Sequence, residues 1–242
     1  NPVPEDVVSG TIKTPDGAEL RFARWAPPAG RKGTVCVFTG RSEQIEKYFE
    51  TVRDLRDRGF AVAMIDWRGQ GHSSRRLRDP RKGYVRDFSD FEVDVETFVQ
   101  QVVLPDCPPP YFALAHSMGG LVTRTMIAKH PDVWSRMGAH AESRLIMLGT
   151  PNGGSYSIPV MLTARDPLVR KLALLDLGHR HGELLEIIAR FTGALQMLPV
   201  QTRWDFFDPA FWAKLADDDH PAKDGAKPWA LPTSKDLEEA RA

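Results

Sequence analysis

The stretch YFALAHSMGG, from Tyr111 to Gly120, decides how the rest of the chain is interpreted. Residues with strand character run directly into Ala-His-Ser-Met-Gly, and an amphipathic pattern follows. This is the sequence form of a nucleophile elbow, in which a serine projects from a sharp turn between a strand and a helix. Such a turn requires small residues two positions away on each side, here Ala115 and Gly119, although glycine is more usual than alanine at the first. We therefore predict Ser117 as a nucleophile.

The residues before and after this stretch predict an α/β fold. A hairpin is expected over residues 7–24, around the turn triplet Pro15-Asp16-Gly17. Strands without alternation are buried on both faces, and helices between them indicate crossover connections, so the sheet is expected to be mostly parallel. The expected buried strands are 34–38, 60–65, the residues before Ser117 and 145–148, and the expected helices are 43–58, 87–103 and 119–129.

The pattern changes after Gly154, where we expect helices and no further strand. Residues 1–154 are therefore predicted as the α/β core, and residues 155–242 as a helical region resembling a lid or cap. Helices are expected from Asp166-Pro167, with Leu168, Leu172 and Leu175, over 182–191, from Asp208-Pro209, and after a cap at Thr233 or Ser234. Asp217, Asp218 and Asp219 are expected in a solvated loop.

Three motifs together resemble the α/β-hydrolase fold. The segments FTGRSEQIEKY (38–48), DWRGQGHSS (66–74) and AHSMGG (115–120) are similar to the lysophospholipase and monoacylglycerol lipase branch. The second half, with SMGGLVTR (117–124) and LIMLGTPNGGS (145–155), looks more like the lecithin:cholesterol acyltransferase-like group. This split suggests a natural mosaic or an engineered chimera. The resemblance covers residues 7–155 well and the remainder weakly.

The resemblance implies an oxyanion hole made of two backbone amides, those of Arg41 and Met118, and no metal or organic cofactor. It also implies an acid and a histidine after later strands, in the order Ser, Asp or Glu, His. We find no strands after Leu148 to carry them, which suggests a fragment, a truncated form or half of an assembly. The catalytic histidine and acid therefore stay unassigned.

None of the histidines is preferred as the base. Adjacent residues at an elbow point in different directions, so His116 is expected to pack or to hydrogen-bond, and His72 is expected to stabilise its loop. Asp66, at a strand end, is likewise expected to organise a loop through hydrogen bonds. The later histidines have equally plain interpretations at a helix end, in connections or in an acidic loop: His130, His140, His179, His181 and His220.

Composition excludes several classes of function. The 32 basic and 32 acidic residues give a formal net charge of zero, so nothing suggests binding to nucleic acid. Cys36 and Cys107 have no metal-ligand spacing and are interpreted as free thiols, which suits a reducing, cytoplasmic compartment. No apolar run is long enough to span a bilayer. The chain begins at Asn1 rather than Met, so a removed signal peptide and secretion stay an open alternative.

Three functions are compatible with these features. The first is a serine hydrolase that cleaves carboxylic esters with apolar acyl chains, small-molecule or lipid, with peripheral contact of the lid-like region with a lipid surface. The second is a catalytically incomplete α/β-hydrolase-like module that acts through binding or self-association at an open sheet edge, giving a homo-oligomer. The third is acyl transfer, which keeps the serine and changes the acceptor.

Overall fold

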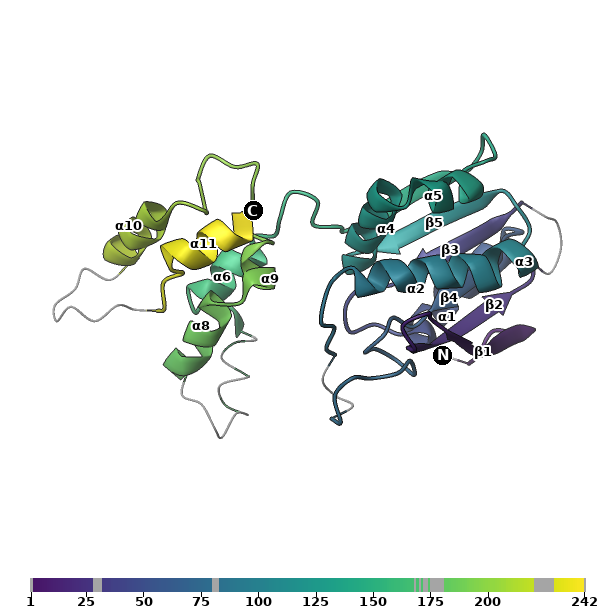
Figure 1. The fold of residues 1–242 in the computed structure, drawn as a ribbon, viewed down its shortest axis with the longest axis horizontal. Helices are drawn as coiled ribbons and strands as arrows, with labels where there is room; N and C mark the ends of the chain where they lie inside the picture. Colours follow the sequence, from purple (N-terminus) through teal and green to yellow (C-terminus); the bar gives the residue numbers. More distant parts are fainter. Residues whose placement is uncertain are drawn as a thin grey trace. The chain divides into compact units, whose positions relative to one another are not determined.

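The computed structural model describes residues 2–27, 32–79, 83–167, 169, 171, 174, 181–219 and 229–241. The chain divides into two compact units, Asn1–Thr150 and Pro151–Ala242. The first unit contains a six-stranded sheet with helices on both faces, and the described part of the second unit is built from helices (Figure 1). The predicted α/β class with a mostly parallel sheet is confirmed.

The sheet has the strand order β1-β2-β4-β3-β5-β6. Its first two strands form the predicted antiparallel hairpin, and β2 also pairs with β4 in antiparallel fashion. The remaining neighbours, β4 with β3, β3 with β5 and β5 with β6, are parallel. The strands are β1 (Val7–Lys13), β2 (Glu19–Trp25), β3 (Thr34–Phe38), β4 (Ala61–Ile65), β5 (Tyr111–His116) and β6 (Arg144–Leu148).

Helices cover the two faces of this sheet with different side chains of the same strands. Cys36 and Phe38 of β3 pack on the face covered by α2 and α4, whereas Val35 and Val37 pack on the face covered by α1. This alternation follows from the two-residue period of a strand, and it explains why β3 is apolar at every position. The helices are η1 (Ile45–Tyr48), α1 (Phe49–Asp57), α2 (Asp90–Phe98), η2 (Val99–Val103), α3 (Leu104–Asp106), α4 (Met118–Lys129) and α5 (Pro131–Met137).

Most expected elements of this unit are present, with local differences. The predicted helix 43–58 begins as a 3₁₀ turn, and the predicted helix 87–103 ends in the π-helical segment η2. Helix α4 ends shortly before Pro131, as expected, but Pro131 is also the first residue of α5. Proline is well tolerated at the first position of a helix. Cys36 and Cys107 are free, as expected, and both are buried.

The expectation that residues 145–148 form a buried strand is wrong in one respect. Strand β6 is present, but it lies at the edge of the sheet and pairs only with β5 among the described strands. Its apolar residues Ile146, Met147 and Leu148 are exposed. An apolar run predicts a strand, but the place of that strand in the sheet depends on its neighbours and not on its own sequence.

The second unit has its own core around Trp212, which is fully buried. Its helices are α6 (Ser157–Leu162), α8 (His181–Ala189), α9 (Thr192–Leu195), α10 (Pro209–Asp219) and α11 (Ser234–Arg241). The expected helix starts at Asp208 and Thr233 are confirmed: Asp208 Oδ1 accepts a hydrogen bond from the Ala210 amide, and Thr233 Oγ1 accepts one from the Asp236 amide. The predicted residues Leu168, Leu172 and Leu175 lie outside the described residues.

The expected acidic loop at Asp217, Asp218 and Asp219 is not present. These residues form the last turn of α10, where the Asp218 carboxylate pairs with Lys214 one turn earlier and Asp219 pairs with Arg165. Such pairs stabilise an acidic helix end that the macrodipole alone would disfavour. Of the helices in the described ranges, none combines the length and the apolar character needed to cross a bilayer.

Candidate active site

Ser117 lies at the junction between β5 and α4, with φ 51° and ψ −119°. A non-glycine residue with this positive φ is strained, at a cost on the order of 1–3 kcal/mol, and such strain is found mainly at functional sites. The Ser117 amide donates to the Leu148 carbonyl of β6 over 2.9 Å, so pairing with the neighbouring strand holds the turn. The serine thus lies at the carboxyl end of the parallel strands.

The residues around Ser117 are small because the turn is tightly packed. Ala115 is fully buried in the sheet. A Cβ atom on Gly119 would overlap the Phe38 carbonyl oxygen at the end of β3. A Cβ atom on Gly120 would overlap Thr150 Oγ1 and lie 2.7 Å from Thr150 Cγ2. These close approaches fix the start of α4 against two neighbouring segments of the same unit.

The loop after β3 contains an amide that has no hydrogen-bond partner among the described residues. The Gly40 amide donates to Glu43 Oε2 over 2.6 Å, and the Ser42 amide donates to Gln70 Oε1. Between them, the Arg41 amide forms no hydrogen bond with any residue that the structure describes, and the same is true of the Met118 amide at the start of α4. Two main-chain donors are therefore available in the two segments that the sequence singled out.

Glu43 ties this loop to the residue before the serine. Its carboxylate accepts from Tyr48 Oη at 2.5 Å, pairs with Lys47, and lies 3.1 Å from Nδ1 of His116. Burial raises the pKa of the Glu43 carboxyl, but the hydrogen bonds from Lys47, Tyr48 and the Gly40 amide outweigh burial and lower this pKa to about 2. Glu43 is therefore ionised at neutral pH, and Nδ1 of His116 is the donor in their contact.

His130 and His140 lie away from Ser117. His130 follows the last residue of α4 and pairs with Glu92, at 3.2 Å. Because α4 has 12 residues, its two ends are about 18 Å apart. His140 precedes β6, and β5 and β6 are parallel. His140 therefore lies at the amino end of the strands, whereas Ser117 lies at their carboxyl end. His179 and His220, and the side chain of His181, lie outside the described residues.

Asp66 organises the loop after β4, as predicted. Its fully buried carboxylate accepts from the Ile45 and His72 amides, each at 2.9 Å, and pairs with Arg21 at 2.7 Å. A Cβ atom on Gly71 would overlap this carboxylate, which explains the glycine there. Asp66 therefore joins strand β2, the start of η1 and its own loop, and His72 contributes through its backbone.

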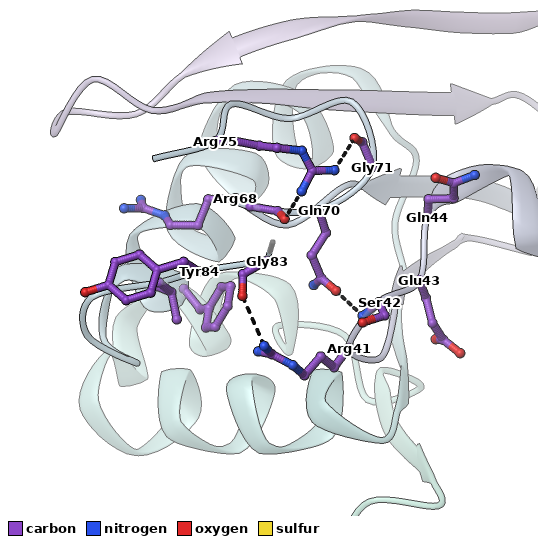
Figure 2. A pocket seen from close by; sticks show the side chains of 13 residues that line it. Arg41, Ser42, Glu43, Gln44, Arg68, Gln70, Gly71, Arg75, Gly83 and Tyr84 are labelled. Carbon is purple, nitrogen blue, oxygen red and sulfur yellow. Dashed lines mark hydrogen bonds between the residues drawn. The ribbon is translucent and has the colours of Figure 1, made fainter. Parts of the chain in front are cut away.

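A polar pocket lies beside the Arg41 loop. It has a volume of about 190 Å³ and is bounded by residues 41–44, by residues 68–71 and Arg75, and by residues 83–85 with Phe91 (Figure 2). Arg41 and Gln70 line it, as Figure 2 shows. The sequence interpretation missed this pocket and the roles of Glu43 and Gln70. Residues 41–44 and 68–71 of the pocket wall fall within two of the motifs quoted above, whereas Arg75, residues 83–85 and Phe91 do not.

Comparison with known proteins finds a family and several relatives that match part of the chain. The family model described as Serine aminopeptidase, S33 (Hydrolase_4) matches residues 29–141, which include the Arg41 loop and Ser117. Together with the sheet order, this match supports the α/β-hydrolase superfamily. Lysophospholipase L2 of Escherichia coli (strain K12) is 38% identical to it over 137 residues. Monoacylglycerol lipase of Mycolicibacterium smegmatis is 26% identical over 200 residues, and Monoglyceride lipase of Mus musculus is 31% identical over 125 residues.

These matches cover different shares of the proteins compared. The match with Lysophospholipase L2 spans 57% of this chain and 40% of the relative, and the match with the mouse lipase spans 50% and 39%. The match with the mycobacterial lipase spans 76% of this chain and 69% of the relative. The chain thus spans about two fifths of the length of the first relative. The resemblance of its second half to the lecithin:cholesterol acyltransferase-like group, and the mosaic or chimera, stay predictions.

Proposed function

We propose that the chain carries the nucleophile and the oxyanion hole of a serine hydrolase that cleaves carboxylic esters with apolar acyl chains. The observation that carries the proposal is the strained Ser117 at the end of β5, together with the free amides of Arg41 and Met118. An ordinary strand-to-helix connection has no need of positive φ at a serine. Backbone strain of this kind is retained where it positions a reacting group.

In the proposed reaction, Ser117 Oγ attacks the carbonyl carbon of the ester and forms a tetrahedral intermediate. The Arg41 and Met118 amides donate to the oxyanion, and each such donor contributes about 3–4 kcal/mol to stabilisation of the transition state. The carbon–oxygen bond to the alcohol then breaks, leaving an acyl-serine that water hydrolyses. A histidine with an acidic partner takes the serine proton and returns it to the alcohol; none of the described histidines is assigned to this step.

The network of Glu43 has a supporting role in this proposal. Glu43 accepts from the Gly40 amide and from His116, so it holds the Arg41 loop beside the residue that precedes the nucleophile. Because Gly40 and Ser42 already have acceptors, the loop presents the Arg41 amide alone toward a ligand. A donor fixed before the reaction needs no reorganisation when negative charge develops.

The relatives support an ester of a lipid as the substrate class, because their names describe lysophospholipases and monoacylglycerol lipases. Residues 155–242 are proposed as a lid whose apolar side chains meet an acyl chain or a lipid surface. Exposed apolar residues in this region are consistent with that role: Tyr156, Val160, Ile187, Phe191 and Val200.

The experiment that tests the proposal is covalent labelling with a fluorophosphonate probe, followed by mass analysis of the modified peptide. We expect a label on Ser117 that is lost in Ser117→Ala. Ser135→Ala is the matched control, because the Ser135 hydroxyl donates to a helix carbonyl and lies in an exposed position on α5. If the folded wild-type protein takes up no label, the nucleophile assignment fails.

A second candidate function is binding or self-association without catalysis. It is favoured by β6, the edge strand whose Ile146 and Leu148 side chains are 47% and 51% exposed. An apolar edge strand with free main-chain groups is a template for pairing with another strand. Under this candidate the folded chain forms a dimer or larger species and takes up no fluorophosphonate.

A further inference from the structure

The polar pocket beside the Arg41 loop has the properties of an anion site. Three loops of the first unit form its wall, and its volume of about 190 Å³ is several times the roughly 30 Å³ that one water molecule occupies in the liquid. Figure 2 shows Arg41 and Arg75 on opposite sides of it, with Gln70 between them. The pocket therefore places three groups with N–H donors around one space.

No carboxylate of the described residues pairs with Arg41 or Arg75. Within the described residues, Arg41 donates to the Gly83 carbonyl over 3.0 Å. Arg75 donates to the Gly71 carbonyl over 2.9 Å and to the Gly69 carbonyl. Main-chain carbonyls position a guanidinium group but leave its formal charge in place, and each group keeps further donors for a ligand.

The other two charged residues of the pocket wall already have partners. Arg68 pairs with Asp16 at 2.6 Å and with the buried Asp94 at 2.7 Å. The Glu43 carboxylate is occupied by the contacts described above, and Figure 2 shows it pointing away from the arginines. The charge that remains for a ligand is therefore positive.

Gln70 supplies a second, independent observation. Its side chain is only 8% exposed, and its Nε2 forms no hydrogen bond with any described residue. The orientation of the amide is fixed, because Oε1 accepts from the Ser42 amide and a reversed amide would place two donors against each other. A buried donor without an acceptor destabilises the protein, and a hydrogen bond to an oxygen atom of a ligand would remove that cost.

We propose that this pocket binds a phosphate group, with Gln70 Nε2 and the guanidinium groups of Arg41 and Arg75 as donors. The donors approach from different loops, and a tetrahedral group with several oxygen atoms can accept from all of them, whereas a carboxylate has two oxygens in one plane. The phosphate belongs either to the head group of an ester substrate or to a free phosphate compound. The first source rests on the proposed function, and phosphate binding itself does not.

The first experiment measures binding and needs no activity. Inorganic phosphate and glycerol 3-phosphate are titrated into the full chain by calorimetry at low ionic strength. Gln70→Glu keeps the acceptor for the Ser42 amide and replaces the free donor by a negative oxygen, and Arg75→Gln removes one positive charge. We expect each variant to weaken binding at least tenfold.

Arg144→Gln is the matched control, since Arg144 also donates to two main-chain carbonyls, those of Ala141 and Ser143. Arg144 lies at the start of β6, at the end of the sheet opposite to the pocket loops. The Arg144→Gln variant should therefore bind phosphate as the wild type does. Thermal unfolding checks that each variant is folded. If the wild type binds neither phosphate compound, or if both folded pocket variants bind them equally well, the proposal is overturned.

The second experiment identifies the source of the phosphate. A lysophosphatidic acid is compared with the monoacylglycerol that carries the same acyl chain, so the two esters differ only by phosphate. If the head group occupies the pocket, the ratio of the two kcat/KM values falls at least fivefold in Gln70→Glu. An unchanged ratio with weakened phosphate binding assigns the pocket to a free phosphate compound. If the protein binds phosphate but hydrolyses neither ester, the phosphate site is supported and the proposed function is overturned.

Discussion

Glu43 Oε2 lies 3.1 Å from Nδ1 of His116, so a carboxylate of the loop after β3 is joined to the last residue of β5, directly before Ser117. The two residues are 73 positions apart in the sequence. The same oxygen accepts from the Gly40 amide at 2.6 Å. One buried charge thus connects two segments whose relative position determines where a nucleophile and an oxyanion donor meet.

Removal of this charge should change the pH dependence of stability. The pKa of Glu43 is lowered to about 2 in the folded protein from an ordinary value of 4.5, so its contribution is fully present above about pH 5 and is lost as the pH falls from 4.5 toward 2. Glu43→Gln should lower the free energy of unfolding by about 1–3 kcal/mol at pH 7. Urea unfolding between pH 3 and 7 should show that the difference from wild type shrinks toward pH 3; a constant difference would contradict the assigned charge.

The strain at Ser117 predicts that a glycine there makes the protein more stable. With φ at 51°, a residue without Cβ relieves a cost on the order of 1–3 kcal/mol, partly offset by the greater freedom of glycine in the unfolded chain. Ser117→Gly should therefore unfold with a free energy about 1 kcal/mol above that of Ser117→Ala, which keeps Cβ and the strain. Chemical denaturation of both variants gives the answer, and equal stabilities would mean that the backbone is relaxed.

Gly120 and Thr150 should be energetically coupled, because a Cβ at position 120 would overlap the threonine side chain. Gly120→Ala is expected to destabilise the protein by about 1–3 kcal/mol. Thr150→Ala removes Oγ1 and Cγ2, so the double variant should recover part of this loss, with a coupling energy of about 0.5–3 kcal/mol.

The matched control for this pair is Gly193→Ala. Gly193 lies in α9. Apart from its chain neighbours and the backbone of its own helix, no atom of the described residues lies within 4 Å of the place that a Cβ would occupy, so alanine should be tolerated and raise stability by up to about 1 kcal/mol. Additive effects of Gly120→Ala and Thr150→Ala in thermal or urea unfolding would show that the two residues do not touch.

The edge strand β6 predicts self-association that charges suppress. Ile146→Lys with Leu148→Lys places two like charges on exposed positions of one face, which should cost little stability but hinder pairing of edges. Light scattering should show a lower mass for this double variant than for wild type at the same concentration. Val200→Lys, at another exposed apolar position, serves as the control. A monomeric wild-type chain would remove the basis for association through β6.

The sequence predicted the elements of the first unit well because its signals are local. The apolar run at Thr34–Phe38 and the turn at Pro15-Asp16-Gly17 each specify their element without help from distant residues, and both have the predicted bounds or nearly so. The exposure of β6 was not predictable in this way, since burial depends on the strands beside it. The helix at Pro131 was missed because proline both ends and begins helices.

The residues of the candidate site were likewise predictable only where the signal is local. Ser117 and its small neighbours follow from a compact motif, and the Arg41 loop follows from resemblance. The contacts of Glu43 with His116 and of Gln70 with the Ser42 amide join residues that are far apart in the chain, so no local pattern reveals them. An unpaired buried donor such as Gln70 Nε2 can be recognised only when all of its surroundings are placed.

Arg41 contributes its side chain to the wall of the polar pocket, while its amide stands free between the occupied amides of Gly40 and Ser42. A ligand that binds the guanidinium group and shifts Arg41 therefore also changes the orientation of the Arg41 amide. Thermodynamic linkage makes this influence reciprocal: an inhibitor that resembles the tetrahedral intermediate and a phosphate compound in the pocket should alter each other's affinity by the same factor. Through Arg41, binding of a phosphate group at one end of a ligand would then increase the reactivity of the ester at its other end.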